Sequence, residues 1–190
     1  MRIGLYFGSF NPIHTGHLII SNYIVQNTNI DQLWFVISPQ NPHKKEKSLL
    51  NKYHRKHLID LAIDGENKLR TSTIEFNLPI PSYTIDTLTY LKEKHPSDSF
   101  SIIMGSDSFK NLPKWKNYEI LIKDYSIYVY ERPGFIVEKP IAENIMVLDA
   151  PLLDISSTRI RKMIKDGLSI KFLVPDVVKE EIEGNHYYKN

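Results

Sequence analysis

Short apolar runs and longer helical patterns alternate along the first 150 residues of this chain. The apolar runs are nearly continuous, which is typical of strands that are buried on both faces of a sheet. We predict strands at Ile3–Phe7, Leu33–Ser38, Phe100–Met104, Ser126–Tyr130 and Ile145–Leu148. Between them, helical spacing of apolar residues predicts a helix after Asp107 and helices at Gly16–Val25, Tyr53–Ile63 and Thr84–Lys94.

Beyond residue 150 the pattern changes to two closely spaced helices, Ser156–Asp166 and Pro175–Glu183, each followed by a glycine. Strands that alternate with helices indicate right-handed crossovers and a parallel sheet covered on both sides. The expected fold is therefore α/β, a Rossmann-like doubly wound parallel sheet with a helical C-terminal end. We expect residues 1–190 to form a single domain, with a core over 1–150 and the C-terminal helices over 151–190.

Composition excludes several kinds of function. Apolar residues make up 42% of the 190 residues and charged residues 24%, as in an ordinary globular protein. A net charge of +2 lacks the basic surplus of a dedicated nucleic-acid binder. The absence of cysteine removes disulfides, thiolate metal sites and a cysteine nucleophile. No apolar run approaches the roughly 18 residues of a membrane span, and the N-terminus lacks a signal-peptide pattern. We therefore expect a cytoplasmic protein without membrane contact.

The segment Gly8–His17 directly follows the first predicted strand. Ligands of an open parallel sheet bind beyond the carboxyl ends of its strands, so a ligand would contact this loop. A helix then begins at Gly16 and His17, and the unpaired N–H groups of a helix start attract phosphate. His14 and His17 are three residues apart, so both rings can point the same way and donate hydrogen bonds to phosphoryl oxygens. The alternative is structural: one histidine caps the helix and the other packs.

Two common nucleotide-binding motifs are absent from the chain. It contains no phosphate loop of the P-loop NTPases and no G-x-G-x-x-G after the first strand. A P-loop ATPase and a simple dehydrogenase are therefore disfavoured. A metal site at the two histidines is disfavoured as well, because no third ligand lies nearby in the sequence.

A second phosphate site is predicted where the first C-terminal helix begins. Ser156 is placed to cap this helix, which is ordinarily all that a serine there does. A capping box would have Glu or Gln three residues later, but the chain has Arg159, close to the positive end of the helix. A bound anion would offset this charge, with contacts from Ser157, Thr158 and Arg161. The alternative is that Asp154 alone neutralises the arginines.

The two motifs together resemble the adenylyltransferases of the class I aminoacyl-tRNA-synthetase-like superfamily. They read Gly-Ser-Phe-Asn-Pro-x-His-x-Gly-His over residues 8–17 and Ile-Ser-Ser-Thr-x-Ile-Arg over residues 155–161. Further matches lie in family order along essentially the whole chain and narrow the resemblance to bacterial nicotinate-nucleotide adenylyltransferases. They are Asn41–Lys44, Arg55–Ala62, Pro81–Thr84, Gly105–Ser108, Leu112–Trp115, Arg132–Gly134 and Leu173–Asp176.

The resemblance implies roles for residues outside the two motifs. Lys44 would contact phosphate, Asp107 would take ribose hydroxyls, and Trp115 would stack on a pyridine ring. The helix start at Thr84 would receive the pyridine carboxylate, and Arg132 would contact the mononucleotide. Each of these residues also has a purely structural interpretation. Lys44 would be one of several solvated lysines in its loop, Asp107 would cap a helix, and Trp115 would belong to the apolar core.

These implications define three sets of residues. The expected catalytic residues are His14, His17 and Arg161. The expected ATP site comprises Gly8, Ser9, Phe10, His14, His17, Gly105, Asp107, Ile155, Ser157, Thr158 and Arg161. The expected mononucleotide site comprises Ser9, Lys44, Thr84, Asp107, Trp115 and Arg132. The hypothesis requires the imidazoles of His14 and His17 to face the start of the helix at Ser156 and not to be buried.

The implied activity is transfer of the adenylyl group of ATP to the 5′-phosphate of nicotinate mononucleotide. The products would be deamido-NAD and pyrophosphate, in NAD biosynthesis. Mg²⁺ is expected with the triphosphate, held mainly by its oxygens and by water, with no protein metal ligands. Nicotinamide mononucleotide or phosphopantetheine as the acceptor remains an alternative, as does a non-catalytic nucleotide-sensing module. The oligomeric state is left open, a homo-oligomer included.

The chain departs from the family pattern at four positions. Phe7 stands where many members have a second glycine. Asn11 and Asn41 stand where Asp and Pro are common. Lys116 follows Trp115 where some members have an aromatic residue, a difference that bears on acceptor discrimination.

Overall fold

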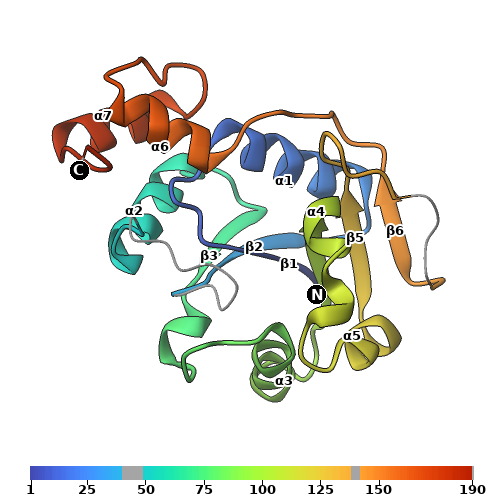
Figure 1. Ribbon diagram of the computed structural model, residues 1–190. Coiled ribbons are helices and arrows are strands. Elements are labelled where there is room, and N and C mark those ends of the chain that lie inside the picture. The colour runs from blue at the N-terminus through green and yellow to red at the C-terminus, as the bar shows by residue number, and fades with distance from the viewer. Residues whose placement is uncertain (40–48, 138–141, 190) are drawn as a thin grey trace.

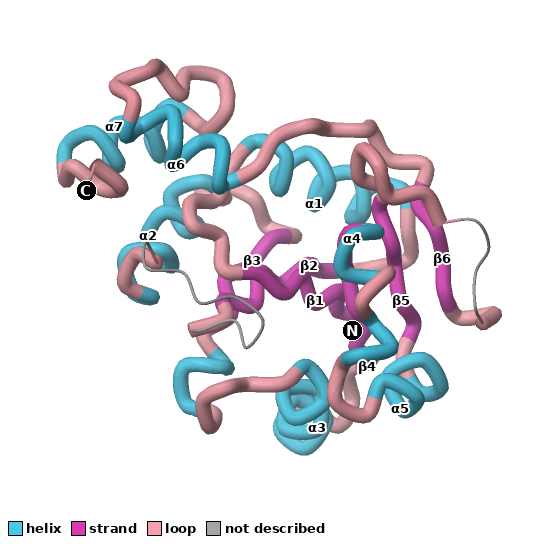
Figure 2. Tube along the Cα trace, viewed as in Figure 1, coloured by secondary structure: helices cyan, strands magenta, loops and turns pink. Residues whose placement is uncertain are grey.

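Six strands form one parallel sheet in the computed structural model, which describes residues 1–39, 49–137 and 142–189 (Figure 2). The strand order is β3-β2-β1-β4-β5-β6. The strands are β1 (Arg2–Gly8), β2 (Gln32–Ile37), β3 (Leu69–Ser72), β4 (Ser99–Gly105), β5 (Ser126–Tyr130) and β6 (Ile145–Leu148). All five predicted strands are confirmed, and their ends move by at most one residue. The predicted doubly wound parallel sheet is confirmed with them.

The sequence pattern missed β3. This strand reads Leu-Arg-Thr-Ser and lies at the edge of the sheet, where it pairs only with β2. None of the residues of β3 is fully buried, so this strand needs little apolar surface. Leu69 is the only apolar residue of β3, so this strand lacks the continuous apolar run by which the other strands were predicted.

Helices connect the strands in the described ranges. The α-helices are α1 (Thr15–Asn27), α2 (Lys52–Ala62), α3 (Thr84–Lys94), α4 (Ser106–Phe109), α5 (Tyr118–Asp124), α6 (Ser157–Lys165) and α7 (Asp176–Gly184). Two 3₁₀ helices, η1 (Ile74–Asn77) and η2 (Leu112–Lys114), complete them. None of these helices has the length and apolar character needed to cross a membrane.

The region around Asp107 contains three short helical pieces, α4, η2 and α5, where the sequence pattern predicted one helix. Pro113 lacks the N–H that a continuing helix needs, and Asn117 adopts a left-handed φ of 53°. These two residues divide the segment.

The helices cover both faces of the sheet (Figure 1). One apolar core joins one face to α1, α2, α6 and α7, and includes Ile20 and Ile160. The core on the other face contains residues of α3, α4 and α5, such as Leu88 and Leu121. The C-terminal helices thus share the first core with the sheet. This continuity supports the expectation of a single domain, which stays a prediction.

The direction of winding reverses between β1 and β4, which are neighbours in the sheet although far apart in the chain. In doubly wound sheets, ligands bind beyond the carboxyl ends of the strands at this switch point. Gly8 ends β1 and Gly105 ends β4. The fold therefore brings two of the sequence motifs to one crevice.

Candidate active site

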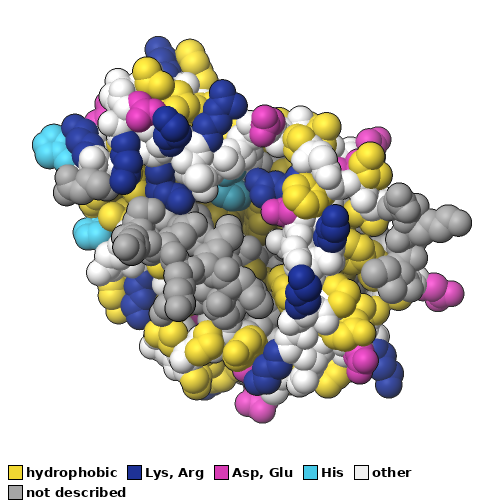
Figure 3. All heavy atoms as spheres, in the orientation of Figure 1, with side chains coloured by type: hydrophobic (Ala, Val, Ile, Leu, Met, Phe, Trp, Pro, Cys, Tyr) yellow, Lys and Arg dark blue, Asp and Glu magenta, His cyan; other side chains and the backbone are white. Residues whose placement is uncertain are grey.

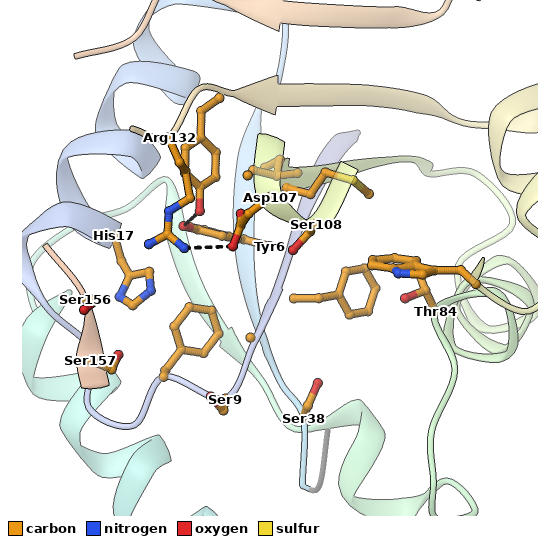
Figure 4. Close-up of a pocket in the computed structure, with 18 of the residues that line it drawn as sticks. Tyr6, Ser9, His17, Ser38, Thr84, Asp107, Ser108, Arg132, Ser156 and Ser157 are labelled. Carbon is orange, nitrogen blue, oxygen red and sulfur yellow. Dashed lines mark hydrogen bonds and ion pairs between the residues drawn. The ribbon is translucent and has the colours of Figure 1, made fainter. Parts of the chain in front are cut away.

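A cleft of about 320 Å³ opens beyond the carboxyl ends of β1 and β4. In Figure 4, His17, Ser156 and Ser157 lie on one side of the cleft and Thr84 lies on the opposite side. Asp107 and Arg132 lie between these two walls. On the molecular surface the cleft is visible as a hollow, with Lys and Arg side chains gathered along its upper edge (Figure 3). The cleft therefore has two walls, one that contains His17, Ser156 and Ser157 and one that contains Thr84.

Nearly all of the residues predicted from the sequence line this cleft. They are Gly8, Ser9, Phe10, His14, His17, Thr84, Gly105, Asp107, Trp115, Arg132, Ser157, Thr158 and Arg161. Ile155 borders a smaller adjoining cavity that His14 and His17 also line. Lys44 lies outside the described residues. The starts of α1 and α6 therefore face the same cleft.

The imidazole rings of His14 and His17 stack on each other, with 3.6 Å between their centroids and an angle of 23° between their planes. His17 also meets Tyr6 and Phe10 edge to face. His14 is only 2% exposed, so the expectation that neither ring would be buried is wrong for His14. As the N-cap residue of α1, it lies beneath the first turn, where a methyl group at Gly16 would come within 3.1 Å of its Nδ1 atom. Its ring borders the cleft nonetheless.

Both histidines are neutral near neutral pH. Burial lowers the pKa of His14 to about 3, and the positive charge of Arg132 acts in the same direction. Burial also lowers the pKa of His17 well below its ordinary value, as do His14 and Arg132. The Nδ1 atom of His17 accepts a hydrogen bond from the backbone N–H of His14 at 3.3 Å. Because a neutral imidazole carries one proton, Nε2 of His17 is the donor that remains for the cleft.

The start of α6 is fastened to the loop between β1 and α1. Ser156 caps the helix by accepting from the backbone N–H of Arg159 at 3.3 Å, as the structural alternative expected. The Ser157 hydroxyl donates to the backbone carbonyl of Pro12 at 2.9 Å. Arg161, only 9% exposed, donates from Nη1 to the carbonyl of Asn11 at 2.8 Å. These bonds hold the two helix starts next to each other, at a set separation, on the same side of the cleft.

Asp107, just after β4, and Arg132, just after β5, form an ion pair with 3.1 Å between Oδ2 and Nη1 (Figure 4). Asp107 does not cap α4, because the N-cap position belongs to Gly105. A methyl group at Gly105 would lie 2.5 Å from Oδ1 of Asp107 and 3.0 Å from Cδ of Arg132. Glycine at this position therefore makes room for the pair.

The opposite wall contains the start of α3 and the segment around Trp115. Thr84 is the first residue of α3, and Trp115 is partly buried against the core while it lines the cleft. The ammonium of Lys116 lies 2.9 Å from both carboxylate oxygens of Asp86 and 5.0 Å from the centre of the Tyr83 ring. Lys116 thus joins the Trp115 segment to the first turn of α3.

Comparison with known proteins agrees with this geometry. The family model described as Cytidylyltransferase-like matches residues 5–163. Probable nicotinate-nucleotide adenylyltransferases of Cytophaga hutchinsonii and Flavobacterium johnsoniae are each 48% identical to the chain, over the full length of both proteins. This chain belongs to the nicotinate-nucleotide adenylyltransferase family. A solved structure of Plasmodium falciparum nicotinic acid mononucleotide adenylyltransferase complexed with NaAD is 25% identical, with a TM-score of 0.84 over 98% of this chain and 97% of that one.

The departures from the nicotinate-nucleotide adenylyltransferase pattern are accommodated locally. Phe7 lies in β1 in ordinary register, opposite Val36 of β2. Asn11 is fully buried, and its Oδ1 atom accepts from the backbone N–H of Leu50 at 3.1 Å. Asn41 lies outside the described residues.

Arg55 belongs to one of the family matches, but sequence reasoning gave it no role. It is fully buried and donates hydrogen bonds to the backbone carbonyls of Leu50, Ser9, Ser38 and Pro39, at 2.9, 2.5, 3.0 and 3.2 Å respectively. A fully buried arginine is rare unless its donors are satisfied. Arg55 therefore ties the β1–α1 loop to the end of β2, beneath the cleft.

The cleft includes further residues that were not part of the expected ATP or mononucleotide sites. They are Tyr6, Phe7, Ser38, Glu75, Ser82, Tyr83, Ile103, Met104, Ser108, Lys114, Lys116, Tyr130 and Ser156. Ser82, Tyr83, Ser108, Lys114 and Ser156 lie inside motifs of the nicotinate-nucleotide adenylyltransferases, so their motif position was a usable signal. Glu75 gave no such signal, because it lies in the short η1 helix outside every motif.

Proposed function

We propose that the cleft transfers the adenylyl group of ATP to the 5′-phosphate of nicotinate mononucleotide, which yields deamido-NAD and pyrophosphate for NAD biosynthesis. The observation that carries this proposal is the pair of helix starts, α1 and α6, that line the same cleft with His14, His17 and Arg161. Each start carries a positive partial charge that attracts a polyphosphate, and at α1, where the backbone N–H groups of Thr15 and His17 donate to the carbonyls of Leu173 and His14, the histidine side chains make the contacts. The names of full-length relatives at 48% identity support the acceptor.

The reaction needs no nucleophilic side chain. An oxygen of the acceptor phosphate, already ionised near neutral pH, attacks the α-phosphorus of ATP in line. The new bond joins that oxygen to the α-phosphorus, and the bond from the α-phosphorus to the bridging oxygen of the leaving pyrophosphate breaks. Positioning and charge stabilisation then supply the catalysis.

The histidines and the start of α6 contact the triphosphate from the same side of the cleft. The Nε2–H of His17 donates to the α-phosphate region, where negative charge develops, and His14 contacts the same region. As a neutral donor, His17 does not need to gain a proton before it acts. Ser157, Thr158 and Arg161 contact the β- and γ-phosphates. On this assignment His14, His17 and Arg161 are the catalytic residues.

The remaining residues orient the two nucleosides. Gly8, Ser9, Phe10, Gly105, Asp107 and Ile155 form the rest of the ATP site. Ser9, Lys44, Thr84, Asp107, Trp115 and Arg132 form the mononucleotide site, with the pyridine carboxylate at the start of α3. Asp107 belongs to both sets, because the end of β4 lies between the two walls of the cleft (Figure 4).

Mg²⁺ fits this site as a companion of the triphosphate. Among the residues that the structure describes, no group of three or more His, Cys, Asp or Glu side chains is placed to hold a metal ion. We expect the ion to be held mainly by phosphate oxygens and water, and to neutralise part of their charge. The expected cytoplasmic location stays a prediction, and the oligomeric state stays open.

A direct assay tests the proposal. The protein is incubated with ATP, Mg²⁺ and one acceptor at a time, and pyrophosphate release is measured. Nicotinate mononucleotide should support the fastest release, ahead of nicotinamide mononucleotide and phosphopantetheine. A preference for phosphopantetheine would overturn the proposed acceptor but would not contradict the fold. Binding of ATP without release for any acceptor would favour a nucleotide-sensing module.

A further inference from the structure

Glu75 is a buried acid in the wall of the cleft, on the side of Thr84. It is 2% exposed and lies in η1, between β3 and α3. Its Oε2 atom accepts from the Ser82 hydroxyl at 2.7 Å, and its Oε1 atom accepts from the Thr87 hydroxyl at 3.0 Å. Ser82 and Thr87 are 8% and 0% exposed. One carboxylate therefore joins η1 to the residues on both sides of the first turn of α3.

The placement of Glu75 demands a physical reason, because a buried carboxylate is expensive unless it is well hydrogen-bonded. Burial raises the pKa of Glu75, and the hydroxyls of Ser82, Thr87 and Ser38 act in the opposite direction. An apolar residue would fill the same space without this desolvation cost. However, an apolar residue cannot accept hydrogen bonds, so it could not hold hydroxyl groups from separate segments in a fixed arrangement.

Glu75 also connects the two walls of the cleft. The hydroxyl of Ser38 also lies near Glu75 and favours the charged form of its carboxyl group. The backbone carbonyl of Ser38 accepts from Arg55, which also holds the carbonyl of Ser9 in the β1–α1 loop. Buried polar contacts thus run from the triphosphate side to the start of α3. Glu75 is the member of this network that touches the acceptor side.

We propose that Glu75 is a positioning residue for the acceptor: it fixes the turn Ser82–Thr84, so that the first N–H groups of α3 point into the cleft. This inference rests on the proposed function, in which the start of α3 receives the pyridine carboxylate. The N-cap residue of α3, Tyr83, forms no side-chain cap hydrogen bond, so the helix start is not fixed by its own cap. Its orientation depends on what holds the turn from outside, and Glu75 does so.

The test compares Glu75→Gln with Glu93→Gln, which makes the same chemical change at an exposed position of α3. Steady-state kinetics give the KM for nicotinate mononucleotide, the KM for ATP and kcat. Glu75→Gln should raise the acceptor KM about tenfold, as expected when a charged hydrogen-bond acceptor is neutralised, and leave the ATP KM within about twofold. Ser82→Ala and Thr87→Val should shift the acceptor KM in the same direction by smaller factors. Glu93→Gln should change none of these values.

Hydrogen–deuterium exchange gives a readout that does not depend on activity. In Glu75→Gln, peptides that cover residues 80–88 should exchange faster, and peptides that cover residues 9–17 should not. Equal rises in both KM values, or an unchanged acceptor KM in a folded variant, would overturn the positioning role. If the wild-type protein does not use nicotinate mononucleotide, the proposed function fails by itself. The exchange pattern then still decides whether Glu75 holds the turn.

Discussion

The Nη1 atom of Arg161 lies 2.8 Å from the backbone carbonyl oxygen of Asn11, across a separation of 150 residues in the chain. Asn11 belongs to the loop that carries His14, and Arg161 lies in the first turns of the helix that faces it. This hydrogen bond therefore helps to set the distance between the two halves of the proposed triphosphate site. Because Arg161 both holds this loop and lines the cleft, it affects the geometry of the proposed triphosphate site and its charge.

Replacement of Arg161 by lysine should separate these two roles. Lysine keeps the charge but loses the planar fork that reaches both Asn11 and Thr158. We expect kcat/KM for ATP to fall at least about tenfold, because a buried hydrogen bond to a charged group is lost. Steady-state kinetics with varied ATP measure this. Arg159→Lys, at an exposed position of the same helix, is the control. Wild-type kinetics in Arg161→Lys would show that the positive charge at this position is sufficient for activity and that the hydrogen bonds of the guanidinium are not needed.

Loss of the His17 side chain should remove a donor from the transition state. His17→Ala is expected to lower kcat by about 100-fold or more, as removal of one preorganised donor does in other enzymes. The circular dichroism spectrum should stay close to that of the wild type, since the ring of His17 lines the cleft and His17 is only partly buried. His57→Ala, at an exposed position of α2, should keep full activity. Near-wild-type turnover in His17→Ala would remove this histidine from the chemistry.

The buried state of His14 should be evident in the pH dependence of stability. Its pKa is lowered from 6.5 to about 3 in the folded protein, so the unfolded chain binds the proton more tightly. The stability that His14 contributes is therefore complete above pH 6.5 and is lost as the pH falls toward 3, by up to about 1.4 kcal/mol per pH unit. Denaturant unfolding of the wild type and of His14→Asn at several pH values measures the difference. Parallel curves for the two proteins would contradict the neutral, buried histidine.

A methyl group at Gly105 should disturb the Asp107–Arg132 pair. The Cβ atom of Gly105→Ala would lie 2.5 Å from Oδ1 of Asp107, so the carboxylate must move. We expect weaker binding of both nucleotides, by about tenfold or more, because a charged hydrogen bond is displaced. Isothermal titration measures each affinity. Gly184→Ala is the matched control, since no atom lies within 4 Å of its added methyl group. Equal affinities in the two variants would mean that Asp107 does not bind ribose.

Much of this fold could be predicted from local pattern. The apolar runs located five of the six strands because buried strands need continuous apolar surface. Pro113 and the left-handed Asn117 divided a segment that periodicity alone suggested was one helix. β3 was missed because an edge strand with one apolar residue carries no run.

The sequence by itself determined the parallel α/β sheet, the two helix starts and the residues whose donors line the cleft, because these depend on spacing and on backbone groups close together in the chain. Only the tertiary structure decided that His14 is buried, that Asp107 pairs with Arg132, and that Glu75 holds hydroxyls on both sides of the start of α3. These contacts join segments brought together by packing of the sheet and its helices. Side-chain pattern along one segment says nothing of which distant segment will lie against it.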